Sequence, residues 1–317
     1  MQSNPFLRPS TKAFLREAKT LPNYSRFDLL HGYIYARWPY FYIAVASGEH
    51  PLARILLPLL EGLSRASSFF ARRRHNHVSN GKAGENREIA FSDTYHGKVV
   101  PLGAATKIVS INTPIPRTDL EHVIPYALAR EIVVKNPHNI AVLECPCRAA
   151  RKKSCAPLDV CLIIGEPFAG FVAEHHPKRA RRITSAEAVE ILQAEDARGH
   201  VHHAFFKDAM LGRMYAICNC CRCCCGAMQS HRNGTPMLAS SGYVAKVDHN
   251  RCIACGTCQK YCQFDAVRVA GETKVIEEAS CMGCGICVPK CKQQAISLVK
   301  DPSRGIPFEI DQVATSK

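Results

Sequence analysis

A repeated pattern of four cysteines near the C-terminus constrains this chain more than any other feature of its sequence. Both copies have the spacing C-x2-C-x2-C-x3-C. Three thiolates at these short intervals wrap a loop around one face of an iron–sulfur cube, while the fourth points towards a different cube. The repeat therefore predicts two 4Fe-4S clusters, with two zinc sites as the alternative. The candidate ligands are Cys252, Cys255, Cys258 and Cys262 in the first copy and Cys281, Cys284, Cys287 and Cys291 in the second.

The segments that flank the repeat alternate between apolar and polar residues as short strands do, at residues 243–248, 266–270, 274–277 and 295–299. With these flanks, residues 241–317 resemble a bacterial-type dicluster ferredoxin domain, which has a two-fold repeated α+β fold. The family usually has proline after its fourth cysteine, whereas this chain has Gln263 and Lys292 at those positions. The resemblance implies crossed ligation, with one cluster on Cys252, Cys255, Cys258 and Cys291 and the other on Cys281, Cys284, Cys287 and Cys262.

The other ten of the 18 cysteines lie upstream, four of them after the apolar segment IAVLE and six in CNCCRCCC. Cys218, Cys221 and Cys224 repeat the C-x2-C-x2-C interval, which predicts a third iron–sulfur cluster with a fourth ligand from residues 145–161. Zinc, copper(I) and thiol redox chemistry are the alternatives. Because ten cysteines exceed what one cube needs, two clusters, one cluster with zinc, and one larger cluster all remain open. The candidate metal ligands are Cys145, Cys147, Cys155, Cys161, Cys218, Cys220, Cys221, Cys223, Cys224 and Cys225.

The region that holds these ten cysteines is predicted to be a mixed α/β domain. Thr118 and Thr184 are each followed three residues later by glutamate, which is the capping-box spacing of a helix start. Strands are expected at residues 140–144, 161–165, 201–206 and 214–218. The chain is therefore expected to be a multidomain α+β protein, with a basic helical segment and linker (1–83), a cysteine-rich α/β domain (84–240) and a ferredoxin-type domain (241–317).

The order of the cysteine motifs carries a second resemblance. A CPCR loop and a CNCC-x-CCC segment upstream of a dicluster ferredoxin domain resemble a group of iron–sulfur binding proteins of anaerobic microbes, over roughly residues 90–300. The histidines of this region are interpreted as surface or packing residues, with metal ligation or proton transfer as the alternative. They are His175, His176, His200, His202 and His203.

Basic residues give the chain a formal net charge of +14, and most of the excess lies in residues 1–83. The basic runs 148–153 and 178–182 are interpreted as solvated faces. Residues 33–74 combine aromatic residues, a leucine stripe and arginines, which is typical of a segment that lies at an anionic membrane surface. Packing on the protein's own core or on a partner subunit is the favoured alternative. Charged residues interrupt every apolar run before it reaches spanning length.

Composition and motifs also limit the location and the partners of the protein. The start of the chain has no basic segment followed at once by an apolar run, so we expect a reducing cytoplasm in which the thiols stay free for metal, with membrane docking placing the chain at the inner face. No groove-reading motif accompanies the basic residues, so a nucleic acid is not expected as a partner. Redox proteins are the expected partners.

The sequence favours an electron-transfer protein that relays single electrons through two 4Fe-4S clusters and a further metal centre in the middle domain. The alternative is an iron–sulfur oxidoreductase whose middle-domain cluster or thiols reduce a substrate with electrons from the ferredoxin domain. No nucleotide-binding glycine motif and no Ser-His-acid set is visible, which favours electron transfer over an enzyme that uses those groups. Storage or delivery of metal on the dense thiols is a third interpretation.

Overall fold

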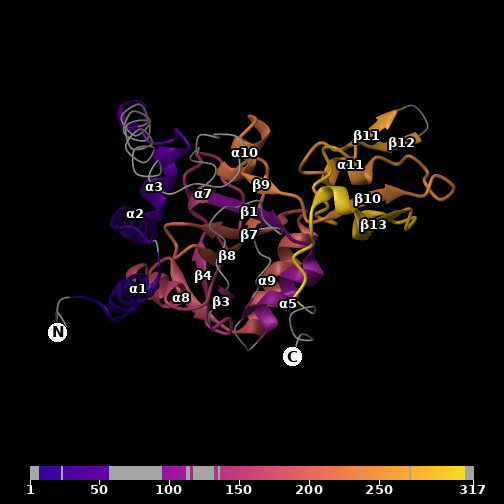
Figure 1. Ribbon diagram of the computed structural model, residues 1–317. Coiled ribbons are helices and arrows are strands. Elements are labelled where there is room, and N and C mark those ends of the chain that lie inside the picture. Colours follow the sequence, from indigo (N-terminus) through magenta and orange to yellow (C-terminus); the bar gives the residue numbers. More distant parts are fainter. Residues whose placement is uncertain are drawn as a thin grey trace, which may run out of the picture.

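The structure is a computed structural model that describes residues 7–22, 24–56, 95–111, 115–116, 132–134, 136–235, 237–270 and 273–310. A sheet with helices on both faces forms its centre, and a smaller unit made by C-terminal residues lies beside that sheet (Figure 1). The N-terminal helices lie on the side of the sheet away from this C-terminal unit.

The central sheet has seven strands in the described residues and is antiparallel except where β9 pairs with β1. In spatial order the strands are β6 (Ala180–Ile183), β4 (Ile140–Glu144), β5 (Asp159–Ile164), β8 (Arg213–Cys220), β7 (Val201–Lys207), β1 (Tyr95–Val99) and β9 (Leu238–Ala239). A separate pair joins β2 (Ile115–Pro116) to β3 (Ile132–Val134). The strands expected at 140–144, 161–165, 201–206 and 214–218 are thus confirmed as β4, β5, β7 and β8.

Each face of the sheet has its own apolar core, because successive strand residues point to opposite faces. On β5, Cys161 and Ile163 belong to the first core, while Leu162 and Ile164 belong to the second. Helices α1 (Pro9–Thr20), α2 (Arg26–Arg37) and α8 (Phe168–His175) contribute to the first core. The second core is covered by α5 (Leu102–Ser110) and α9 (Ser185–Ala197). Side chains of the first face therefore lie between the sheet and the N-terminal helices.

Three helices precede the sheet: α1 (Pro9–Thr20), α2 (Arg26–Arg37) and α3 (Pro39–Ala46). Tyr33, Tyr35 and Tyr40 pack against the first core, whereas Trp38 and Phe41 are about half exposed. The predicted amphipathic segment thus has both core-packed and exposed aromatic residues in its described part, and its leucines beyond residue 56 lie outside the described residues. Among the helices that the structure describes, none has the length and apolar character needed to cross a membrane.

The C-terminal unit contains two antiparallel strand pairs and two short helices around a third apolar cluster. The close approach of a loop to the strand that begins at Tyr243 depends on Gly283, which has a φ of 65° and whose added Cβ would lie 2.1 Å from the carbonyl oxygen of Tyr243. The pairs are β10 (Tyr243–Val247) with β13 (Ile296–Lys300) and β11 (Val267–Ala270) with β12 (Thr273–Ile276), and the helices are α11 (Thr257–Tyr261) and α12 (Cys287–Lys290).

Two sequence-based expectations lie outside the described residues: the helix that starts at Thr118 and the boundary between residues 83 and 84. The second capping prediction is confirmed, since the Thr184 hydroxyl accepts the backbone N–H of Glu187 at 3.2 Å and α9 begins there. The end of the chain returns to the middle domain, where Phe308 and Ile310 pack into the second core. The remaining helices are α7 (Pro146–Ala149), α10 (Gly226–Arg232) and a 3-10 turn (Pro302–Arg304).

Candidate metal centres

Two hollows in the described part of the C-terminal unit are each bordered by four cysteines. The first encloses about 350 Å³, open in part to solvent, and the second about 370 Å³. Each hollow takes three cysteines from one copy of the repeat and the fourth from the other copy. The first is bordered by Cys252, Cys255, Cys258 and Cys291, and the second by Cys281, Cys284, Cys287 and Cys262.

Short helices and backbone groups position these sulfur atoms. Helix α11 ends directly before Cys262, and α12 ends directly before Cys291. Each helix therefore separates the fourth cysteine of its repeat copy from the loop that carries the first three. Backbone N–H groups approach two of the sulfurs, from Ala295 to Cys291 at 3.3 Å and from Ala245 to Cys281 at 3.5 Å. Such N–H groups stabilise the added charge of a reduced cluster and so tune its potential.

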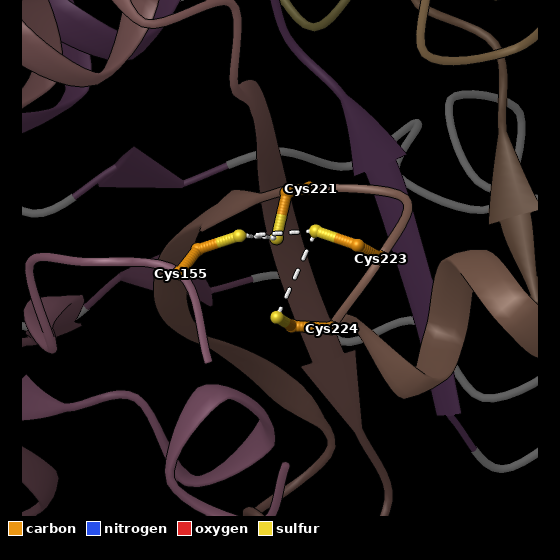
Figure 2. A group of neighbouring side chains, drawn as sticks. All are labelled: Cys155, Cys221, Cys223 and Cys224. Atoms are coloured by element: carbon orange, nitrogen blue, oxygen red, sulfur yellow. Dashed lines mark hydrogen bonds between the residues drawn. The ribbon is translucent and has the colours of Figure 1, made fainter. Parts of the chain in front are cut away.

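A separate tetrad of cysteines lies in the middle domain, where the loop after α7 meets the turn after β8 (Figure 2). The sulfur atoms of the tetrad all lie within 4.8 Å of one another. Cys155 and Cys223 are 3.0 Å apart, and contacts of 3.7 Å join Cys221 to Cys155 and Cys224 to Cys223. The tetrad consists of Cys155, Cys221, Cys223 and Cys224.

The spacing of the tetrad fits a single tetrahedral ion. With metal–sulfur bonds of about 2.3 Å, the corners of a regular tetrahedron lie about 3.8 Å apart. A cube holds its four cysteines farther apart, because each sulfur then binds a different iron atom. An all-sulfur tetrahedral site is typical of zinc or of a single iron ion.

The tetrad thiols differ in how readily they ionise. Burial raises the pKa of Cys155 and Cys223 to about 11 and that of Cys221 to about 12. Burial also opposes ionisation of Cys224, but hydrogen bonds from Cys155 and its neighbours hold the pKa of Cys224 below its ordinary value. A metal ion binds thiolates and must displace the protons of these thiols, which makes metal binding at the tetrad pH-dependent.

The other six middle-domain cysteines form a second group, which we call the six-thiol ring. The thiols of this group lie near one another in a series and shift each other's pKa, with Cys218 next to Cys161, Cys161 next to Cys145, and Cys145 next to Cys147. The series continues from Cys147 to Cys225 and from Cys225 to Cys220. Cys220 and Cys218 are two residues apart on β8 and share a face of the sheet, which closes the ring. The six-thiol ring consists of Cys145, Cys147, Cys161, Cys218, Cys220 and Cys225, all of them free of disulfides.

These two groups differ from the grouping that the C-x2-C-x2-C interval predicts. Cys221 and Cys224 belong to the tetrad, but Cys218 belongs to the ring, because β8 continues to Cys220 and only the turn beyond it faces Cys155. One cysteine from residues 145–161, Cys155, does lie beside this turn as part of the tetrad. Sequence reasoning thus found all ten cysteines but not their division into four and six.

Sequence reasoning missed the role of Arg148, which lies in a run interpreted as a solvated face. Its side chain is only 1% exposed, and its guanidinium lies 2.5 Å from the carboxylate of Glu195. It also donates to the carbonyl oxygens of Pro157 and Asn219. Arg148 therefore joins the loop that carries Cys155 to the segment that carries Cys218 and Cys220. Its position directly after Cys147 was the available signal.

A second residue that sequence reasoning undervalued is Gln263. Its side-chain oxygen accepts the backbone N–H of Arg222 at 3.1 Å, and the Arg222 guanidinium pairs with Asp265. Arg222 lies between the tetrad residues Cys221 and Cys223. Gln263 therefore fixes the tetrad loop against the C-terminal unit, which a proline side chain at this position cannot do.

The histidines of the middle domain are mostly packing residues, as expected. His200, His202 and His203 are buried. His200 is 2.6 Å from Glu195, and His202 is 2.6 Å from the side-chain oxygen of Asn219. In the described part of the chain, none of them joins the cysteines of the tetrad.

Comparisons with known proteins support the cluster prediction for the first copy of the repeat. Residues 245–268 match the family model described as a 4Fe-4S binding domain, and they contain Cys252, Cys255, Cys258 and Cys262. A search of curated proteins finds no match to the chain. The match and the tetrad together indicate an iron–sulfur protein with at least one 4Fe-4S cluster and a cysteine-rich metal site.

Proposed function

We propose that this chain is an electron-transfer protein of the dicluster ferredoxin type, which relays single electrons through two 4Fe-4S clusters and exchanges them with a redox protein partner. The observation that carries this proposal is the crossed arrangement of the two hollows. Each hollow has four cysteines at its border, and together they use all eight cysteines of the repeat once. The clusters supply reversible one-electron chemistry, and the protein holds them and sets their potentials.

In this proposal the tetrad is the further metal centre of the middle domain. Because its spacing fits one ion, we infer a single zinc or iron ion there in place of the cube that the cysteine interval predicts. An iron ion held by four thiolates exchanges an electron, whereas a zinc ion has no redox chemistry and only holds the two loops together. The oxidoreductase alternative stays a prediction.

Losses of iron from matched variants test the proposal. The chain is purified without oxygen, and iron, acid-labile sulfide and zinc are measured in the wild type, in Cys252→Ala with Cys255→Ala, and in Cys281→Ala with Cys284→Ala. Each variant should lose about four irons and four sulfides relative to the wild type, and EPR of the dithionite-reduced protein should change from two interacting signals to one. A first variant that loses a cluster beside a second that loses none would contradict the dicluster proposal.

The tetrad variant Cys155→Ala with Cys223→Ala identifies the ion. Loss of one zinc with no change in the reduced EPR signals would assign the tetrad a holding role. Loss of one iron, together with the visible bands of a thiolate-bound ferric ion, would assign it a redox role. Unchanged zinc and iron contents would contradict a metal at the tetrad.

A further inference from the structure

The six-thiol ring differs from the tetrad mainly in the spacing of its sulfur atoms. Cys145, Cys161, Cys220 and Cys225 are each less than 9% exposed, and the tetrad has two cysteines as buried as these beside the exposed Cys223. Within the described residues, the tetrad is the group whose ligand atoms all lie within 4.8 Å of one another, so the ring sulfurs do not have the tight mutual spacing that a single tetrahedral ion needs.

The ring is assembled from separate parts of the fold. Cys145 and Cys147 lie at the start of α7, Cys161 is the cross-strand partner of Cys218 where β5 pairs with β8, and Cys225 directly precedes α10. Cross-strand partners point to the same face of a sheet, so Cys161 of β5 and Cys218 of β8 lie on one face. The starts of α7 and α10 bring their cysteines to the same face. A packing role alone does not require six thiols to converge from four segments.

The surroundings of the ring disfavour free thiolates. Burial raises the pKa of Tyr35 of α2, and the nearby thiols of Cys218 and Cys147 raise it further. Burial also raises the pKa of Tyr40 of α3, to which Cys161 contributes. The interaction of Cys145 with the neighbouring Cys147 thiol raises the pKa of Cys145 to about 12. Thiolates in this place need the positive charge of bound metal, and each ligating thiol gives up its proton to solvent as its bond to metal forms.

A short aromatic route connects the ring to the C-terminal unit. Phe264 borders the second hollow, together with Cys262 and Cys284. The phenyl group of Phe264 lies edge-on to the imidazole of His203, with centroids 6.5 Å apart. His203 is in turn the cross-strand partner of Cys218. Two side chains thus separate the second hollow from the six-thiol ring.

From this convergence we propose that the six-thiol ring binds an iron–sulfur cluster of its own, distinct from the ion of the tetrad. Six soft thiolate ligands exceed the four of a tetrahedral ion, and a group of several irons bridged by sulfide takes thiolate ligands on different irons, as sulfur atoms spread over a mostly buried site require. The role of this cluster as the next electron carrier after the second hollow rests on the proposed function, but its presence does not.

The test compares matched pairs of cysteines in the full chain. Cys161→Ala with Cys218→Ala removes two ligands from the ring, and Cys155→Ala with Cys223→Ala removes two from the tetrad. We expect the ring variant to lose about four irons with a matching amount of sulfide while its zinc content stays unchanged, and the tetrad variant to keep all its sulfide. A ring variant with the same iron and sulfide content as the wild type would overturn the proposal.

The wild type provides a second measurement that does not depend on the folding of a variant. With all three clusters in place it should hold about twelve sulfides and about twelve irons, plus one iron if the tetrad ion is iron, whereas about eight sulfides would leave none for the ring. If about eight irons are found and four are lost with each pair of repeat cysteines, the ring cluster is overturned and the proposed function stands. If the repeat variants lose no iron but the ring variant does, the proposed function fails and the ring cluster stands.

Discussion

The guanidinium of Arg222 lies 2.6 Å from the carboxylate of Asp265, and this ion pair joins the tetrad loop to the residue three positions after Cys262. Asp265 also pairs with Arg232, at 3.4 Å. The two units of the protein thus meet beside two candidate metal centres. Both partners of the first pair are about half exposed, so the position of the pair matters more than its energy.

Replacing Asp265 by asparagine should therefore change stability little. The variant keeps the left-handed backbone of this residue (φ 55°), which asparagine adopts readily, and loses both ion pairs. We expect the free energy of unfolding to fall by less than about 1 kcal/mol, because water screens exposed pairs. Thermal unfolding at low and high salt checks this, and a shift in the midpoint of more than about 4 °C would contradict it.

Breaking the buried pair of Arg148 and Glu195 should have a much larger effect. Arg148→Met leaves the Glu195 carboxylate without the main partner of its fully buried side chain, which costs about 3 to 5 kcal/mol. Because Arg148 also holds the loop of Cys155, the variant should lose the tetrad ion before it unfolds. Metal content during thermal unfolding measures both effects. The exposed pair of Arg181 and Glu187 supplies the control, since Arg181→Met should shift neither.

Gln263→Pro introduces the residue that dicluster ferredoxins usually have at this position and removes the acceptor of the Arg222 N–H. The backbone of Cys262 is extended (φ −69°, ψ 114°) and accepts a following proline. With a hydrogen bond worth about 1 kcal/mol, a chelator should remove the tetrad ion about fivefold faster. Lys292→Pro, after the equally extended Cys291, is the matched control. Equal rates in both variants would contradict a holding role for Gln263.

The stability of the protein should rise with pH because of Lys207. Burial lowers the pKa of Lys207 to about 7, although its ammonium lies 5.0 Å from the centre of the Tyr35 ring. An unfolded lysine has a pKa near 10.4, so between these values the unfolded chain binds a proton that the folded chain lacks, and stability increases with pH. The buried charge of Lys207 therefore lowers the free energy of unfolding by its full amount below pH 7, and this loss of stability disappears towards pH 10.

Lys207→Met removes this contribution to the pH dependence. The variant should therefore be more stable than the wild type at pH 6.5, and its advantage should shrink at pH 9. Thermal unfolding of both proteins across this range measures the difference. Lys178→Met, at an exposed lysine, is the control. Parallel profiles for the wild type and Lys207→Met would show that this lysine is not responsible.

Local sequence patterns predicted much of the fold. Strand β4 begins and ends at the predicted residues, and α9 starts at the cap that Thr184 and Glu187 define. Both depend on neighbours in the sequence: an apolar run fits a buried strand, and the threonine hydroxyl satisfies a nearby N–H. The order of strands in the sheet does not follow from such patterns, since it depends on contacts between distant segments.

By itself the sequence predicted the eight cysteines that border the two hollows and the strands around them, because three cysteines of each hollow lie within seven residues of one another. Only the tertiary structure decided how the other ten cysteines are shared. The intervals in CNCCRCCC suit several groupings, and β8 selects one by ending at Cys220. Alternate residues of a strand point to the same face, so Cys218 and Cys220 lie on the sheet face that Cys161 shares. The turn after β8 instead places Cys221, Cys223 and Cys224 beside Cys155.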